Sequence, residues 1–458
     1  MSARLARPAA LALQVALGLA AVTIYLISYS KQHGIGFGPD RIDLGAYRVG
    51  ARAWLRGANL YGQLPRTPSG LRLSFTYPPI AAVLMAPLAL VPMAVADTAL
   101  TLVTIALVAA VLGLFLHCLT GSGAVPARTL GWLVLGALAL EPVRNTLALG
   151  QINVILMAMV AFDGLLVSPR WPRGALTGLA AAVKLTPAAF VLFFLLRRDY
   201  RAAGTAALAF AAATGAGFVL AGHDSVRYWT GAVFQVGRIG QPGYAGNQSI
   251  QGVLARAGLS PHTPAGLAAW LGLCAVVLVV TGLGMRRALA AGERGLALGL
   301  NALAALLISP ISWSHHWVWC VPVLLTLAIL GLGQRGRRAR LPLAVAAAGL
   351  VIFAAAPQWW FPYTGHHSWH WALWEQAIGS SYVLFGALVL VLAASGLLIR
   401  RSSDQDEMDR PAVSAPRARR GRRLTAGPLS PGRDLSPAAL TAGPRARRAP
   451  RRCGAPSA

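Results

Sequence analysis

The sequence predicts an all-α, multi-pass membrane protein, on the strength of its composition, its hydropathy and the length of its apolar runs. Of its 458 residues, 56% are hydrophobic and only 12% are charged, whereas a soluble domain carries about 25% charged residues. The mean hydropathy is +0.58. A soluble protein of this size would need a charged surface around two or three domains. These values argue against a soluble enzyme, a nucleic-acid-binding protein and a fibrous protein.

About twelve apolar runs predict transmembrane helices, because a helix needs about 20 apolar residues to cross a bilayer. The runs begin near residues 11, 79, 97, 129, 150, 174, 203, 263, 295, 313, 341 and 380. The run over 11–30 is interpreted as an uncleaved first span, because no clear small-residue cleavage site follows it. Residues 1–399 are therefore expected to form one polytopic membrane domain.

The positions of the arginines predict the orientation in the membrane, since cytoplasmic loops are enriched in Lys and Arg. Four clusters fall on one side if the chain crosses twelve times: Arg4 and Arg7; Arg197, Arg198 and Arg201; Arg286, Arg287 and Arg294; and Arg335, Arg337, Arg338 and Arg340. This side is expected to be the cytoplasmic side of the cell membrane. Arg170 and Arg173 then fall outside, an exception that a broken or re-entrant helix within 129–196 would explain.

The last segment, 400–458, is expected to be a disordered cytoplasmic tail. It supplies +9 of the net charge of +27, and it is rich in Pro, Ala, Arg, Gly and Ser. Such a composition cannot bury a core. We interpret the tail as a topology anchor that touches anionic membrane lipids. Clustered Arg without a predicted fold is weak support for the alternative, nucleic-acid binding, and we expect no nucleic-acid partner.

One acidic residue stands out as a candidate general base. Only nine acids precede residue 400, and Asp43 follows the first span within a long first outer loop, roughly 31–78. A carboxylate at the outer membrane surface could take a proton from an attacking sugar hydroxyl. The alternative is a helix N-cap for a helix over 44–55.

Polar residues within apolar runs are functional candidates, because they are costly at membrane depth. Gln151 and Asn153 suit a partly unwound segment lining a polar cavity, although interhelical hydrogen bonds and a buried Glu141–Arg144 pair are the alternative. Lys184 is the only lysine in the membrane region. It could bind a phosphate, or it could extend to the membrane interface.

The aromatic and histidine-rich outer segments leave similar choices open. His315 and His316 follow Trp313, and one of them could hydrogen-bond a phosphate or a sugar hydroxyl, or both could belong to an aromatic belt at the interface. Tyr77 lies in a stretch that is either a helix start or a pocket wall. Adjacent histidines are a poor two-ligand metal site. The spacing of three further histidines suits a metal, but their Trp-rich loop suits sugars equally well: His366, His367 and His370.

Two absences restrict the donor. Residues 1–399 contain neither a Walker-type Gly-rich loop nor an Asp-x-Asp motif, which argues against a nucleotide-driven pump and against a metal-bound nucleotide sugar. An outward-facing enzyme would also not meet cytosolic nucleotide sugars. We therefore expect a membrane lipid as the activated donor, with no metal and no cofactor.

Six short motifs, in order over roughly residues 10–400, give the chain a family resemblance. They are Asp43-Leu-Gly-Ala-Tyr47 with Gly57-Ala-Asn-Leu-Tyr61, Phe75-Thr-Tyr-Pro-Pro79, Leu149-Gly-Gln-Ile-Asn153, Gly178-Leu-Ala-Ala-Ala-Val-Lys-Leu-Thr-Pro187, Gly246-Asn-Gln-Ser249 and Ser309-Pro-Ile-Ser-Trp-Ser-His-His316. With these motifs the chain resembles the actinobacterial polyprenyl-phosphate-mannose-dependent α-mannosyltransferases of glycosyltransferase family 87, in the GT-C superfamily.

The resemblance implies a multi-pass GT-C fold with an outward-facing site. Such enzymes move mannose from a polyprenyl phosphate to an envelope lipid glycan with inversion, typically as an α-(1→2) linkage. The acceptors are lipomannan, lipoarabinomannan or phosphatidylinositol mannosides. The acidic base of the first outer loop corresponds to Asp43.

We assign expected roles on the same basis. Asp43 is the base, and Lys184 with His315 or His316 stabilises the leaving phosphate. The remaining predicted substrate contacts are Tyr47, Tyr77, Gln151, Asn153, Asn247, Gln248 and Trp313. Two other functions stay open: an arabinosyltransferase of the same superfamily, and a non-catalytic transporter of lipid-linked sugars.

Overall fold

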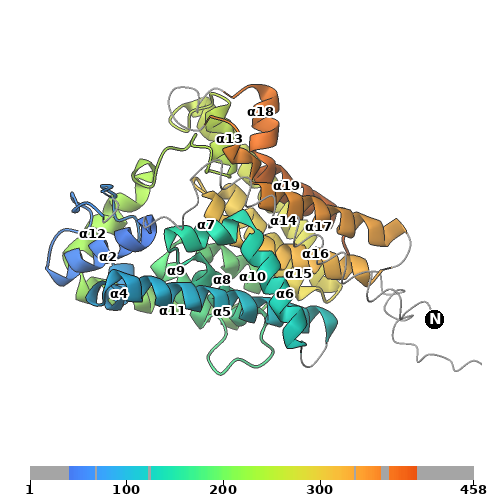
Figure 1. Cartoon of the computed structure of the whole chain (residues 1–458), viewed down its shortest axis with the longest axis horizontal. Coiled ribbons are helices and arrows are strands. Elements are labelled where there is room, and N and C mark those ends of the chain that lie inside the picture. Colours follow the sequence, from blue (N-terminus) through green and yellow to red (C-terminus); the bar gives the residue numbers. More distant parts are fainter. Residues whose placement is uncertain (1–40, 68–69, 122–124, 335–336, 363–370, 400–458) are drawn as a thin grey trace, which may run out of the picture. The chain divides into compact units, whose positions relative to one another are not determined.

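The computed structural model describes residues 41–67, 70–121, 125–334, 337–362 and 371–399. These residues are helical and contain no strand, although Asn247 and Trp313 form an isolated β-bridge. The all-α prediction is therefore confirmed for the described chain (Figure 1). Three predictions lie outside the described residues: the first span over 11–30, the three histidines of 363–370, and the tail over 400–458.

The helices fall into long apolar rods and short segments between them. In chain order they are α2 (Ile42–Leu55), α3 (Pro79–Leu84), α4 (Ala86–Leu90), α5 (Met93–Thr120), α6 (Ala127–Ala139), α7 (Glu141–Leu149), α8 (Asn153–Leu165), α9 (Ala175–Val183), η1 (Thr186–Phe190), α10 (Val191–Leu196), α11 (Tyr200–Leu220), α12 (Gly222–Thr230), η2 (Ala232–Phe234), η3 (Val236–Arg238), α13 (Ile250–Arg256), α14 (Pro264–Ala290), α15 (Arg294–Ile308), η4 (Ser314–Trp319), α16 (Cys320–Leu332), α17 (Arg337–Ala355), η5 (Pro357–Trp359), α18 (Leu373–Gly379) and α19 (Ser381–Ala394).

Five of the described helices are long and apolar enough to cross a membrane, and the bent pair α18–α19 makes a sixth. The five are α5, α11, α14, η4 with α16, and α17 with η5. The prediction of about twelve spans is thus not confirmed as a count. Two of the predicted spans are wrong. The run from residue 79 forms α3 and α4, of six and five residues, and neither can reach across a bilayer.

The run from residue 174 is the second error, because the chain turns back within it. Arg173, just before α9, and Arg197, just after α10, both donate to the carbonyl of Gly164, at 3.3 and 2.9 Å. Both ends of the 174–196 segment therefore lie at the end of α8. The segment is a hairpin, which agrees with the broken or re-entrant helix that the exception of Arg170 and Arg173 suggested.

This hairpin also corrects the predicted side of Arg173. Its Nε lies 3.9 Å from Asp199 Oδ2, at the start of α11, so Arg173 shares its end of the helices with the cluster at 197–201. The hairpin is broken at Lys184, whose backbone is extended (φ −148°), directly before Pro187 opens η1. Lys184 thus stands at the tip of the hairpin, inside the helical bundle.

Close packing against α11 fixes the hairpin. Gly178 of α9 faces the backbone of α11, and a Cβ at this position would lie 2.2 Å from the carbonyl oxygen of Ala206. Only glycine permits this approach. At the other end of the bundle, α2 is joined to α11 because Trp54 Nε1 donates to the carbonyl of Leu220 (2.9 Å).

Several of the short helices lie outside the group of long ones. In Figure 1, α2, α4 and α12 lie at the left and α13 and α18 at the top, away from the chain reversals after α5 and α8. Residues of all four predicted outer segments, roughly 31–78, 222–262, 309–316 and 357–379, line one cavity.

Candidate active site

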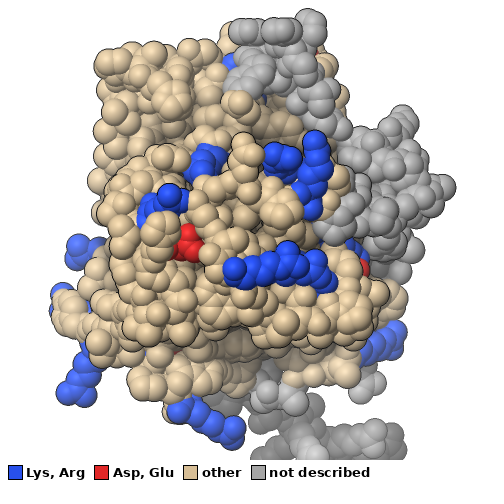
Figure 2. Space-filling view, turned by 90° about the vertical axis from the view of Figure 1, so that its left-hand side faces the viewer, with Lys and Arg blue, Asp and Glu red and all other residues tan. Residues whose placement is uncertain are grey.

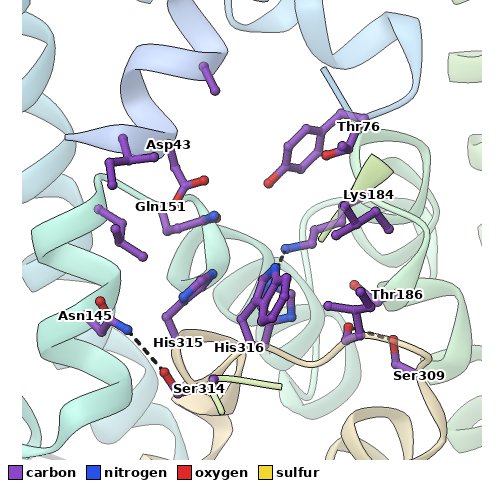
Figure 3. A pocket seen from close by; sticks show the side chains of 18 of the residues that line it. Asp43, Thr76, Asn145, Gln151, Lys184, Thr186, Ser309, Ser314, His315 and His316 are labelled. Atoms are coloured by element: carbon purple, nitrogen blue, oxygen red, sulfur yellow. Dashed lines mark hydrogen bonds between the residues drawn. The ribbon is translucent and has the colours of Figure 1, made fainter. Parts of the chain in front are cut away.

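The predicted site residues converge on one large cavity of about 1290 Å³. Four stretches distant in the sequence form its polar wall: the start of α2, the α7–α8 loop, the tip of the hairpin and the start of η4. Eight of the eleven predicted residues line it: Asp43, Tyr47, Tyr77, Gln151, Lys184, Trp313, His315 and His316. Figure 3 shows Asp43 and Gln151 facing Lys184 across this cavity.

Asp43 lies in the first turn of α2, one residue after the helix begins. The N-cap position belongs to Arg41, so the N-cap interpretation of Asp43 is wrong. A carboxylate in the first turn is favoured by the helix dipole. Burial nonetheless raises the pKa of Asp43 to about 6, while the Gln151 side chain and the Lys184 ammonium act in the opposite direction. A carboxyl with this pKa is poised as a proton acceptor near neutral pH.

Hydrogen bonds between aromatic and amide side chains build the wall beside Asp43. Tyr47, on the next turn of α2, donates to Gln151 Oε1 (2.6 Å), and its oxygen lies 3.1 Å from the Tyr77 hydroxyl. Gln151 can reach Tyr47 because Gly150 has a positive φ of 67° and packs against Leu44, which a Cβ would approach to 2.7 Å. Gly150 is therefore required both for the turn and for the contact.

Lys184 supplies the positive charge on the opposite wall. Its Nζ donates to Asn153 Oδ1 (3.0 Å) and lies 3.1 Å from His316 Nε2. Because an ammonium only donates, Nε2 of His316 accepts here and its ring proton belongs on Nδ1. An ammonium has three donors, and the contacts described for Lys184 use two of them. One donor is thus left for a ligand in the cavity.

His315 occupies the floor of the site beside His316 (Figure 3), with ring centroids 4.8 Å apart. Its Nε2 is buried and has no hydrogen-bond partner among the described residues. Its backbone carbonyl, by contrast, is held firmly by Thr146 Oγ1 (3.0 Å) and Asn153 Nδ2 (2.9 Å). The backbone is fixed, and the ring nitrogen is left without a partner in the described part of the protein.

The other three predicted substrate contacts are not among the residues that line this cavity, and their side chains form hydrogen bonds within the protein. Asn153 does not line the large cavity; it faces a second cavity of about 50 Å³ and joins Lys184 to His315. Asn247 donates to the carbonyls of Pro242 and Pro310 and accepts from the Ser312 amide.

Gln248, the third, donates to the carbonyls of Ala245 and Gly379. Asn247 and Gln248 are both fully buried. They hold the loop that leads into His315, a role in which an amide side chain replaces a missing helix or sheet partner.

The sequence interpretation missed Glu141 as part of the site. Its buried carboxylate lines the cavity and accepts from four neutral donors: Ser314 Oγ (2.7 Å), Trp359 Nε1 (3.0 Å), Tyr382 OH (3.0 Å) and Asn145 Nδ2 (3.2 Å). It thereby ties α7 to the start of η4, to η5 and to α19. The scarcity of acidic residues was the signal in the sequence that could have identified Glu141. The sequence instead suggested a buried pair of Glu141 with Arg144.

Metal ligation finds no support in the described ranges, where no three His, Cys, Asp or Glu side chains form a group able to hold a metal ion. The site therefore offers a carboxylate, an ammonium, two imidazoles and several hydroxyls. This set can deprotonate a hydroxyl on one side of the cavity and stabilise an anion on the other.

Comparison with known proteins identifies the family. The model of glycosyltransferase family 87 matches residues 75–310. A polyprenol-phosphate-mannose-dependent alpha-(1-2)-phosphatidylinositol mannoside mannosyltransferase of Mycobacterium tuberculosis is 42% identical over 408 residues, which cover 86% of this chain and 93% of the relative. The chain belongs to glycosyltransferase family 87.

Two further relatives support the assignment of this chain to family 87. A protein of Mycolicibacterium smegmatis with the same name is 40% identical over 410 residues, covering 84% of this chain and 91% of the relative. A pentamannoside mannosyltransferase of Mycobacterium tuberculosis is 33% identical over 299 residues, which cover 63% of this chain and 67% of the relative. No solved structure matches the chain. The predicted resemblance to family 87 is thus confirmed, and the chain is a membrane glycosyltransferase.

Proposed function

We propose that this chain transfers mannose from polyprenol phosphate mannose to a phosphatidylinositol mannoside, as an α-(1→2) linkage and with inversion at the anomeric carbon. The names of the 40–42% identical relatives support the donor, the acceptor and the linkage. The family assignment favours an enzyme over a transporter, and the relatives' names favour mannose over arabinose.

The observation that carries this proposal is a carboxylate and an ammonium on opposite walls of one cavity (Figure 3). Asp43 takes the proton of the acceptor hydroxyl while that oxygen forms a bond to the anomeric carbon. The bond from this carbon to the phosphate oxygen breaks in the same step, and polyprenyl phosphate leaves with the electron pair. Lys184 and the neighbouring imidazoles stabilise its negative charge.

The size of the cavity supports the binding of two substrates at once. Its volume of about 1290 Å³ exceeds the ~300–1,000 Å³ of a typical site for one small ligand. Apolar side chains of α5 (Ile105), α14 (Trp270) and α15 (Ile308) also line the cavity. Two lipid-borne substrates need such apolar surface.

We further propose that the chain lies in the cell membrane with this site outward. The basic loops at the far ends of α8, α10 and α14 support that orientation. Shorter helices such as α8 and α15 complete the crossings together with the longer ones, for a total of about ten when the first apolar run is included. With an even number of crossings, the C-terminal tail lies on the cytoplasmic side of the membrane.

The decisive experiment supplies the purified enzyme with radiolabelled polyprenyl phosphate mannose and a phosphatidylinositol mannoside, followed by linkage analysis of the product. We expect an α-(1→2)-linked mannose from wild type and none from Asp43→Asn, with donor binding retained. Donor binding is measured separately, so that loss of folding is recognised. Transfer of arabinose from its polyprenyl phosphate in place of mannose, or full turnover by Asp43→Asn, would overturn the proposal.

A further inference from the structure

A continuous row of aromatic rings leads away from Asp43 along the cavity wall. Tyr47 and Tyr77 are 5.4 Å apart between ring centroids, Tyr77 and Phe75 are 5.8 Å apart, Phe75 and Tyr61 are 6.3 Å apart, and Tyr61 and Tyr228 are 5.4 Å apart. All five line the cavity. Tyr77 is half-buried and the other four are buried, so the row forms a packed wall. A wall of apolar rings with polar hydroxyl edges suits the alternating apolar and hydroxylated faces of sugar rings.

An arginine stands beside Tyr61, the fourth ring of this row. Arg238 lines the cavity, and its guanidinium carbon lies 6.0 Å from the ring centroid of Tyr61. Its Nη2 is buried without a hydrogen-bond partner, and the side chain makes no ion pair within the described ranges. The nearby carboxylate of Asp224 instead accepts the backbone N–H of Leu60 (3.1 Å).

This lack of a partner distinguishes Arg238 from Arg41, another arginine of the cavity wall. Arg41 pairs with Asp97 at 2.8 Å and also donates to the carbonyl of Leu147. Buried donors in folded proteins nearly always have a partner. A buried guanidinium nitrogen left without one beside a substrate cavity points to an anionic group of the substrate, which a guanidinium can bind with two parallel hydrogen bonds.

The surrounding surface is positively charged. In Figure 2, Lys and Arg side chains greatly outnumber Asp and Glu on the face that includes α2 and α12. The exposed arginines of the two outer segments are Arg52, Arg56, Arg66, Arg72 and Arg227. Their field attracts anionic lipids toward the cavity.

We propose that Arg238 is a second anion site, which binds the phosphodiester of the acceptor lipid while its mannose chain lies along the aromatic row toward Asp43. This inference rests on the proposed function and deepens it. The cavity then separates its two phosphates: the donor phosphate lies at Lys184, and the acceptor phosphate lies at Arg238. The enzyme thereby selects acceptors that carry an anionic head group, in addition to the correct terminal sugar.

The test compares two acceptors with the same mannose chain in neutral phosphatidylcholine nanodiscs at saturating donor. One is a phosphatidylinositol mannoside, and the other is a neutral alkyl oligomannoside. We expect Arg238→Gln to raise KM for the phosphate-bearing acceptor about 10- to 100-fold, the size expected for a lost charged hydrogen bond. Its kcat, and both constants for the neutral acceptor, should stay at wild-type values.

Two further variants separate a specific site from a general charge effect or a misfolded protein. Arg72→Gln removes an exposed arginine of the same surface, one that donates to Gln63, and should change neither KM. Arg238→Lys keeps the charge without the paired donors, and should keep part of the preference for the phosphate-bearing acceptor. If wild type ignores the neutral acceptor, inhibition by glycerophosphoinositol takes its place and must weaken in Arg238→Gln.

The experiment distinguishes a failure of the proposed anion site from a failure of the proposed function. Equal effects of Arg238→Gln on both acceptors, or no effect on either, overturn the anion site while leaving mannosyl transfer intact. A wild-type enzyme that transfers mannose to neither acceptor overturns the proposed function, and the assignment of Arg238 with it.

Discussion

At the scale of single residues, the site depends on how each polar group is satisfied. Gln151 and Lys184 line the cavity, whereas the Asn247 side chain donates to two backbone carbonyls and accepts from a backbone amide. From the sequence, both kinds of residue are simply polar groups in an apolar chain. Motif and composition can therefore predict which residues gather near a site, but not which of them face the substrate.

Asp43 gives the first prediction, a dependence of the rate on pH. Its pKa is raised to about 6 by burial, and only the ionised form can accept a proton. The rate of transfer should therefore rise with pH through about 6 and fall about tenfold for each pH unit below it. The measurement is kcat/KM between pH 4.5 and 8 in detergent or nanodiscs. A flat profile across this range would contradict the role of Asp43.

At the scale of elements, Glu141 holds the segment that carries both histidines. Its four neutral donors come from four separate elements, so the carboxylate fixes the start of η4 against α7 and α19. Nothing in the local sequence predicts this arrangement, since Ser314 and Tyr382 lie 173 and 241 residues away along the chain. Apolar run length predicted the long helices well, but long-range polar contacts of this kind require the fold.

The second prediction concerns this carboxylate. Glu141→Gln replaces one acceptor oxygen with a donor, and so leaves a buried donor such as the Tyr382 hydroxyl without an acceptor. We expect a loss of about 1–3 kcal/mol in unfolding free energy and a lower kcat. Tyr382→Phe removes a single donor and should have a smaller effect on both. Thermal unfolding in detergent measures the stability of the two variants, and the transfer assay measures their kcat. Equal effects of the two variants would contradict the role of Glu141 as the common acceptor of four donors.

The hairpin gives the third prediction. Gly178→Ala places a methyl group within 2.2 Å of the Ala206 carbonyl oxygen, so α9 must move away from α11 and carry Lys184 with it. We expect a lower thermal midpoint and a higher KM for the donor. Gly204→Ala is the matched control, because a Cβ at Gly204 of α11 meets no atom within 4 Å. If both variants behave like wild type, the hairpin does not depend on this contact.

At the scale of the whole molecule, the structure changes the number of segments that are interpreted as membrane spans. Hydropathy predicted about twelve spans because it cannot distinguish a crossing from a run that enters and returns, nor from two short helices such as α3 and α4. The physical information that separates these cases lies in tertiary contacts, such as the two arginines on the Gly164 carbonyl. Arginine position in the sequence pointed to the broken or re-entrant helix, but hydropathy alone did not.

The fourth prediction tests the orientation in intact cells. In a cysteine-free background, His262→Cys places a thiol on the exposed segment before α14, and Arg201→Cys places one at the opposite end, at the start of α11. A membrane-impermeant maleimide should label the first and spare the second until the membrane is opened. Labelling of Arg201→Cys alone would place the site on the cytoplasmic side.

The return of the chain at Lys184 also bears on how the protein is made. During synthesis, the apolar stretch over 174–196 is long enough to be threaded across the bilayer like any other. Had it crossed, α11 and each helix after it would have entered the membrane upside down. Arg173 and Arg197 donate to one carbonyl and so hold both ends of the hairpin together in the folded protein. The direction of each helix in the second half of the chain depends on this return.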